Sequence, residues 1–329
     1  MQLPGVDVFR KPIIPASSFA AILGGHLDGR DESVLRMKVL FSTLAILAIT
    51  VGSCGSGALA SSRQHIRKRS KSDANISAIG HRRIVQGPNR YSLESEKQIG
   101  KALSEKVEQS SKLLADPAIT EYIDRVAQTV AKNSDALMPI TVRVTDTDSV
   151  DAFTLPGGYQ YVSRGLLLSL TGEGELASVL ARGIAHTALR STTTLATRAE
   201  TMLVSSVPLM SAPGGSFPGN AVSAVPLMSL EMHSNDELDA DYFGVQYLYR
   251  AGYDPQCFIS FVQRTWGSGA TATNVPTTFR HYPPLDERLA ALRSEISKIL
   301  PPREGATVST PEFDAFKDRL RILKTDGQK

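Results

Sequence analysis

Cysteine is scarce in this chain, whose 329 residues include only Cys54 and Cys257. Two cysteines are too few for a small fold that depends on a framework of disulfides. Cys257 belongs to an apolar segment with no histidine near it in the sequence, so we predict a buried thiol rather than a nucleophile. The Gly-x-Ser-x-Gly motif of serine hydrolases is also absent. Serine and cysteine catalysis therefore have little support.

A large excess of charge of one sign is lacking too. The chain has 36 lysines and arginines and 33 aspartates and glutamates, which gives a net charge of +3. Much of the basic excess lies between Arg63 and Arg83, in a stretch rich in serine, asparagine and glycine. A nucleic-acid-binding domain concentrates positive charge on its folded surface, so we expect no nucleic-acid partner. With 42% hydrophobic and 21% charged residues, the composition is typical of a globular protein, and we find no internal repeat.

The uncharged apolar run Val39–Val51 follows the basic residue Lys38 and is too short to span a bilayer comfortably. It predicts a secretory signal, with a buried helix or an uncleaved anchor as the alternatives. Val51-Gly-Ser-Cys54 is similar to a lipoprotein box, which would make Cys54 the lipidation site, whereas Ala58-Leu-Ala60 has the form of an ordinary cleavage site. We favour the lipobox and expect an exported protein, either periplasmic or an outer-membrane lipoprotein that associates with the membrane through its lipid anchor.

The chain divides into five predicted regions. A signal should begin a chain, so we interpret residues 1–36 as an upstream start that was assigned wrongly, followed by the signal at 37–60. Residues 61–92 are a predicted basic linker, either a solvated spacer or a segment that lies on anionic headgroups. The folded domain is expected at 93–300, and the C-terminal tail at 301–329 should contain a short helix over Thr310–Leu323.

Within the predicted domain, apolar spacing indicates mostly helices with a few strands. Ile140–Thr145 alternates and is β-branched, which predicts a strand, and the turn Pro156-Gly157-Gly158 joins two extended runs into an edge hairpin. Serine, threonine, glycine and proline dominate Thr192–Met228, so we predict a long loop or flap there, with disorder as the alternative. The expected fold is therefore α+β and mostly helical, with a small mixed sheet. Helices are expected around residues 99–114, 119–130, 175–190, 231–251, 257–262 and 289–299.

The stretch Glu175–Arg190 is the centre of this arrangement, because its helical register places Arg182 and His186 four residues apart on one side. In the zincin motif H-E-x-x-H, two histidines at this spacing bind zinc and the glutamate acts as the general base. Here the slot reads Arg182-Gly183-Ile184-Ala185-His186, so only the second histidine is present. Gly183 occupies the position of the base, and no residue is a confident catalytic group.

Together these pieces resemble the gluzincin zinc metallopeptidases (peptidase family forty-eight), which include the CAAX prenyl proteases, HtpX and the periplasmic BepA-type proteases. The run from Asp151 to Val162 is similar to the family's edge strand N-A-F-A-L-P-G-G-x-I-x-V, and Glu237-x-x-x-Asp241 is similar to its third-ligand motif. The resemblance implies a zincin-like metallopeptidase fold and a zinc cofactor held by His186 and Glu237. It also implies that Asp241 orients a zinc-binding histidine from outside the ligand set. It further implies a substrate loop at His281 and Tyr282, and a substrate edge strand formed by Ala152, Phe153, Leu155, Gly157 and Gly158.

The family's activity is zinc-dependent cleavage of peptide bonds, and the resemblance implies unfolded or envelope proteins as clients. Arg182 cannot lose its proton to become a ligand, so zinc should be bound weakly or lost. We therefore predict a degenerate copy that acts by binding, in which Arg182 fills the vacated metal position and pairs with Glu237. Two alternatives stay open. Arg182 could point to solvent, or the chain could be an active endopeptidase that uses His186, Glu237 and a substitute ligand such as His233.

Overall fold

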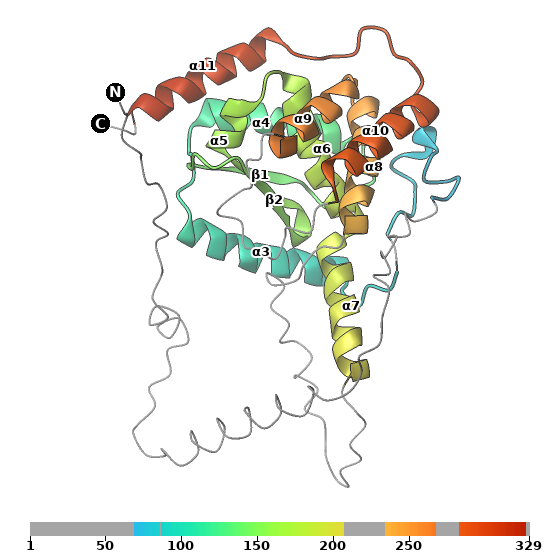
Figure 1. Cartoon of the computed structure of the whole chain (residues 1–329). Helices are drawn as coiled ribbons and strands as arrows, with labels where there is room; N and C mark the ends of the chain where they lie inside the picture. The colour runs from blue at the N-terminus through green and yellow to red at the C-terminus, as the bar shows by residue number, and fades with distance from the viewer. Residues whose placement is uncertain (1–68, 86, 207–233, 268–282, 327–329) are drawn as a thin grey trace, which may run out of the picture. The chain divides into compact units, whose positions relative to one another are not determined.

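A computed structural model of the chain describes residues 69–85, 87–206, 234–267 and 283–326 (Figure 1). The predicted signal, Cys54, His233, His281 and Tyr282 lie outside these residues. In the described ranges, no helix combines the length and apolar character needed to cross a bilayer. The elements in chain order are η2 (Ile76–Ala78), α3 (Leu93–Ser110), α4 (Pro117–Ala131), β1 (Thr141–Thr145), β2 (Ala152–Leu155), η3 (Pro156–Gly158), β3 (Tyr159–Ser163), α5 (Arg164–Ser169), α6 (Glu173–Leu189), α7 (Ser191–Ser206), α8 (Ser234–Arg250), α9 (Gln256–Gly267), α10 (Leu285–Ile299) and α11 (Pro311–Asp326).

The expected α+β class is confirmed, and the sheet formed by the described residues has three strands in the order β1-β3-β2. Strand β3 pairs in parallel with β1 and antiparallel with β2, so the sheet is mixed and β2 is an edge strand. The turn between β2 and β3 has positive φ at Gly157 (78°) and Gly158 (89°). A Cβ atom at Gly158 would lie 2.2 Å from the carbonyl oxygen of Pro139, so this turn requires glycine.

The two faces of the sheet contact different helices. Helix α3 runs along one face (Figure 1), where Leu155 and Tyr161 form a small apolar cluster with Val107. On the other face β1 contacts α4 and β2 contacts α6. Because side chains alternate along a strand, Gln160 and Val162 of β3 point to that second face.

Helix α6 is the centre of the domain, as the sequence predicts. All of its residues are buried, and it contacts α4, α8 and α9 as well as β2. A helix buried on every side can place polar side chains in contact with several neighbours at once. It ends at Arg190, which has a left-handed backbone (φ 53°) and donates from Nε to Glu96 Oε2 at 2.6 Å.

The predicted loop over Thr192–Met228 is wrong in its first part, since Ser191–Ser206 forms helix α7. The side chains of Thr193 and Thr197 are fully buried, and Thr193 donates to Glu96. Threonine has a low helix propensity, and this tertiary packing outweighs it. Residues 207–228 of the predicted loop lie outside the described residues.

Part of the predicted linker packs on the domain. Ile79 and Ile84 are buried in the main core, at 3% and 2% exposure. Arg82 donates from Nε and Nη2 to the carboxylate of Asp135, at 3.0 and 2.6 Å, and Tyr247 donates to the same carboxylate at 2.8 Å. The packed domain therefore includes residues before 93, which differs from the linker expected there. The apolar residues of this segment follow neither a helical nor a strand period, so the sequence pattern did not predict this packing.

Candidate functional site

The candidate site lies between α6 and α8, where the sequence predicts the metal centre. His186 comes from α6 and Glu237 from α8, and the two side chains are buried at 7% and 3% exposure. His186 Nε2 lies 3.8 Å from Glu237 Oε2. The fold thus brings together the two residues predicted as zinc ligands, although their ligand roles stay predictions.

Arg182 lies in the same site and does not point to solvent. Its guanidinium group donates to Glu237 and forms a buried ion pair with that carboxylate. Its Nε atom also lies 3.4 Å from Asp241 Oδ1. The Arg182–Glu237 pair predicted from the sequence is present, and the solvent-facing alternative is wrong.

Asp241 is held by a second arginine, from the start of α10. Arg288 donates from Nε and Nη2 to the two carboxylate oxygens of Asp241, at 2.7 and 2.9 Å. Such bidentate pairs are among the stronger hydrogen-bonded contacts in proteins. Arg288 is only 1% exposed, so its charge needs this partner. Two guanidinium groups therefore balance two carboxylates in the site.

Trp266, at the end of α9, lies against both arginines. The centroid of its ring is 4.0 Å from the guanidinium carbon of Arg288 and 5.5 Å from that of Arg182. Cations at this range are attracted to the negative face of an indole ring. Trp266 thus extends the ionic cluster from α6, α8 and α10 to a fourth helix, α9.

His186 is uncharged in this environment. Burial, followed by the nearby charges of Arg182 and Arg288, holds the pKa of His186 well below its usual 6.5. Its Nδ1 atom lies 3.3 Å from the hydroxyl of Ser191, at the start of α7. A neutral imidazole adds no positive charge to a cluster that already holds two guanidinium groups.

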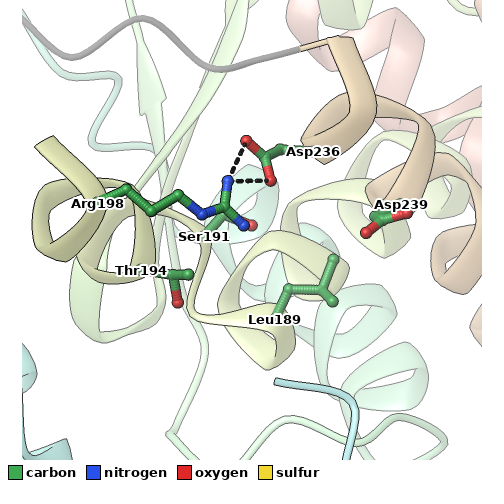
Figure 2. A pocket seen from close by; sticks show the side chains of 6 residues that line it. All are labelled: Leu189, Ser191, Thr194, Arg198, Asp236 and Asp239. Atoms are coloured by element: carbon green, nitrogen blue, oxygen red, sulfur yellow. Dashed lines mark hydrogen bonds and ion pairs between the residues drawn. The ribbon is translucent and has the colours of Figure 1, made fainter. Parts of the chain in front are cut away.

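A small polar cavity adjoins Ser191 where α6, α7 and α8 meet (Figure 2). Arg198 reaches across it from α7 and donates to both carboxylate oxygens of Asp236, at 3.1 and 3.2 Å. The cavity has a volume of about 20 Å³, which is enough for one water molecule but not for an amino-acid side chain. It is lined by Leu189, Ser191, Thr194, Arg198, Asp236 and Asp239.

The predicted substrate edge is partly buried. Leu155, Gly157 and Gly158 are buried, and the ring of Phe153 stacks on Tyr161 with centroids 4.9 Å apart. These residues shape the strand and its turn. What β2 can offer a peptide is its backbone edge, because it pairs only with β3 in the described sheet.

The side chains of the site do not fit a catalytic zinc ion. A zinc enzyme supplies three protein ligands, and among the described residues no group of three or more histidine, cysteine, aspartate and glutamate side chains is placed to hold a metal. A guanidinium group stands where the first ligand is expected. The general-base position is Gly183, whose neighbours are the side chains of Gln160 and Thr154.

A family model described as Peptidase family M48 matches residues 117–296, more than half of the chain, including all the helices of the ionic cluster. The chain belongs to peptidase family M48. Members of this family are zinc metallopeptidases. The resemblance drawn from the hairpin and the Glu237 helix is thereby confirmed at the level of the family.

Three bacterial relatives of this M48 chain carry a more specific name. This chain is 26% identical over 247 residues to the beta-barrel assembly-enhancing protease of Yersinia pestis, and the match covers 72% of the chain and 50% of the relative. The protein of that name from Escherichia coli K12 is 24% identical over 253 residues, with the same coverage of 72% and 50%. A relative from Vibrio cholerae, whose assignment to this function is provisional, is 29% identical over 241 residues, covering 68% of the chain and 48% of the relative. The chain spans about half the length of these relatives.

Sequence reasoning missed Arg288, Trp266 and Gln160. A signal existed for Arg288, because it falls on the apolar stripe of α10 with Leu285 and Leu292, where a cation must be paired. Gln160 stands on the same side of β3 as the buried Val162, so strand alternation marks it as an inward polar residue. Nothing in the sequence pattern points to Trp266.

Proposed function

We propose that this M48 chain binds protein clients in the bacterial envelope without cleaving them. One observation carries the proposal, which is that Arg182 occupies the first-ligand position and pairs with Glu237. Zinc and the guanidinium group compete for the same carboxylate, so an organic cation takes the structural role of the metal.

The electrostatics of the site support this proposal. A divalent cation is attracted by carboxylates that lack counter-charges, whereas here Glu237 and Asp241 face Arg182 and Arg288. Metal entry would have to displace a buried guanidinium group, and breaking a buried pair costs about 3–5 kcal/mol. The absence of a general base at position 183 would by itself remove roughly 10²- to 10⁴-fold of rate.

The edge strand is the surface on which we propose that clients bind. An extended peptide can add to the free edge of β2 through backbone hydrogen bonds, which need no particular side chains. The names of the relatives point to β-barrel proteins of the outer membrane as the client class. Since the chain spans about half of those relatives, this class is part of the proposal.

Export to the envelope is also proposed. It rests on the signal-like segment at 37–60 and on Cys54, which would carry a lipid if the lipobox is used. A lipid anchor would keep the domain at a membrane surface, where folding outer-membrane proteins pass. Mass spectrometry of Cys54 in the cell-derived protein tests the anchor separately from the site.

The second candidate function is an active zinc endopeptidase. It is favoured by the 3.8 Å separation of His186 Nε2 and Glu237 Oε2, which leaves two family ligands side by side. It requires Arg182 to swing away and another residue to supply the third bond, for which His233 is the candidate.

Metal analysis of the purified full chain separates the two functions. We expect far less than one zinc per chain, and no cleavage of casein above background. Cleavage that a chelator abolishes, and that is lost in His186→Ala, would overturn the binding function in favour of the enzyme. The binding itself is measured by titrating an unfolded outer-membrane protein into the full chain, where saturable binding without cleavage is expected.

A further inference from the structure

Gly183 of α6 lies so close to the sheet that a side chain at this position would meet its neighbours. An ideal Cβ atom built on it would lie 2.7 Å from Cδ and Oε1 of Gln160, and 2.8 Å from Oγ1 of Thr154. Contacts below 3.0 Å are essentially never seen for real Cβ atoms, so a side chain at position 183 would require Gln160 and Thr154 to shift. The space beside Gly183 is therefore filled by two polar side chains from the sheet.

Gln160 and Thr154 act as one unit in the sheet. They are directly paired in the register of β2 and β3, so their side chains lie next to each other on the face toward α6. In the family pattern quoted above, alanine stands at the position of Thr154 and isoleucine at that of Gln160. Both departures replace an apolar residue by a polar one, and both face the glycine that replaces the glutamate.

The environment of Gln160 shows how closely this space is filled. The side chain is only 3% exposed, so its carboxamide cannot swing into solvent without opening the contact between α6 and the sheet. Its Nε2 atom has no hydrogen-bond partner among the described residues. Leaving a buried donor unpaired is unfavourable. Packing, rather than a hydrogen bond from Nε2, therefore holds the Gln160 carboxamide beside Gly183.

We propose that Thr154 and Gln160 obstruct the catalytic site independently of Arg182, because their side chains fill the volume that the general-base glutamate needs. This proposal rests on the proposed function and deepens it. Arg182 excludes the metal, whereas the pair from the sheet excludes the base. Restoring the H-E-x-x-H residues on α6 alone does not then restore a zincin site.

The test compares two variants of the full chain. The first, Arg182→His/Gly183→Glu, restores the helix motif only. The second adds Thr154→Ala and Gln160→Val, which remove the three atoms nearest to a Cβ at position 183 and place apolar residues in the strands. Zinc per chain and the affinity for zinc are measured in both, together with thermal unfolding.

We expect the helix-only variant to unfold at a lower temperature than the wild type and to bind zinc at least tenfold more weakly than the four-residue variant. Equal zinc affinity and equal stability in the two variants would overturn the proposal. Failure of the proposed function is a different result, because it appears as zinc bound by the wild type.

A smaller change keeps the test decisive if the larger variants fail to fold. Gly183→Ala should lower Tm by about 3–8 °C in the wild type, through overpacking. In a Thr154→Ala/Gln160→Val background, the same change should leave Tm unchanged or raise it, because alanine favours a helix. The control is Gly267→Ala, whose Cβ would meet, among the described residues, only Leu285 at an ordinary 3.6 Å. A rise in Tm for Gly183→Ala in the wild type would contradict the filled volume.

Discussion

The β2–β3 hairpin and the α6–α8 site are neighbours in one M48 domain, and both depart from the family pattern, but at different kinds of position. The hairpin keeps Pro156, Gly157 and Gly158, and a Cβ at Gly100 of α3 would lie 2.0 Å from the carbonyl oxygen of Pro156. The site keeps His186 but has Arg182 and Gly183 in the other two positions of its motif. The hairpin keeps the residues that its backbone conformation requires. The site has lost residues that only the zinc chemistry requires.

The difference teaches which groups this fold needs. Close approach of two backbones leaves no room for any side chain, so only glycine serves at those positions. A metal site makes a weaker demand on the fold, because a buried carboxylate needs a cation but not a particular one. Arg182 and Arg288 meet that demand for Glu237 and Asp241.

The largest effect is expected in the hairpin. Gly158→Ala places a Cβ 2.2 Å from the Pro139 carbonyl oxygen at a φ of +89°, and neither backbone can yield without breaking the turn. We expect a loss of at least about 5 kcal/mol in the free energy of unfolding, measured by urea denaturation.

The matched control for this hairpin variant is Gly305→Ala. Gly305 also has a positive φ, +69°, but a Cβ there would meet no atom of the described residues within 4 Å. Only the backbone strain of about 1–2 kcal/mol should then appear. Equal losses at the two positions would mean that close approach is not what fixes the hairpin.

The next effect concerns the ion pair of the site. Arg182→Met leaves the Glu237 carboxylate buried without its main counter-charge, which should cost about 3 kcal/mol. Adding Glu237→Gln removes the stranded charge and should recover most of this loss. Urea denaturation of the two single variants and the double variant gives the coupling energy. Additive losses would show that the two side chains do not depend on each other.

The smallest effect is a pH dependence. Because the pKa of His186 is held well below 6.5, the unfolded chain binds a proton at this residue at a pH where the folded chain does not. Its contribution to stability is complete above pH 6.5 and is lost as the pH falls, by up to about 1.4 kcal/mol per pH unit. His186→Gln should flatten this part of the stability profile between pH 7 and pH 5. An unchanged slope in the variant would assign the dependence to other groups.

The sequence was sufficient for the parts of the fold that have strong local signals. The helix expected around residues 119–130 is α4, which Asp116 caps with its side chain and Pro117 begins, a position where proline is favoured. Strand alternation identified β1, and the paired glycines identified the hairpin. The Arg182–Glu237 contact followed from placing both residues on a known architecture.

What the sequence did not reveal depends on long-range packing. Helix α7 contains threonines that favour extended structure, and it forms because Thr193 and Thr197 are buried against the domain. Ile84 joins the core from a segment with no regular period. Arg288 and Gln160 reach the site from elements far away in the chain, so a local pattern marks them as buried but cannot say which partner they meet.

Trp266 has a practical consequence, because it is the only tryptophan of the chain. All indole fluorescence of the full-length protein therefore originates from a ring in contact with Arg288 and near Arg182. Emission wavelength and intensity respond to nearby charge and to water, so any event that moves these guanidinium groups is visible in the unmodified protein. The chain carries its own spectroscopic probe at the position where its family holds a metal.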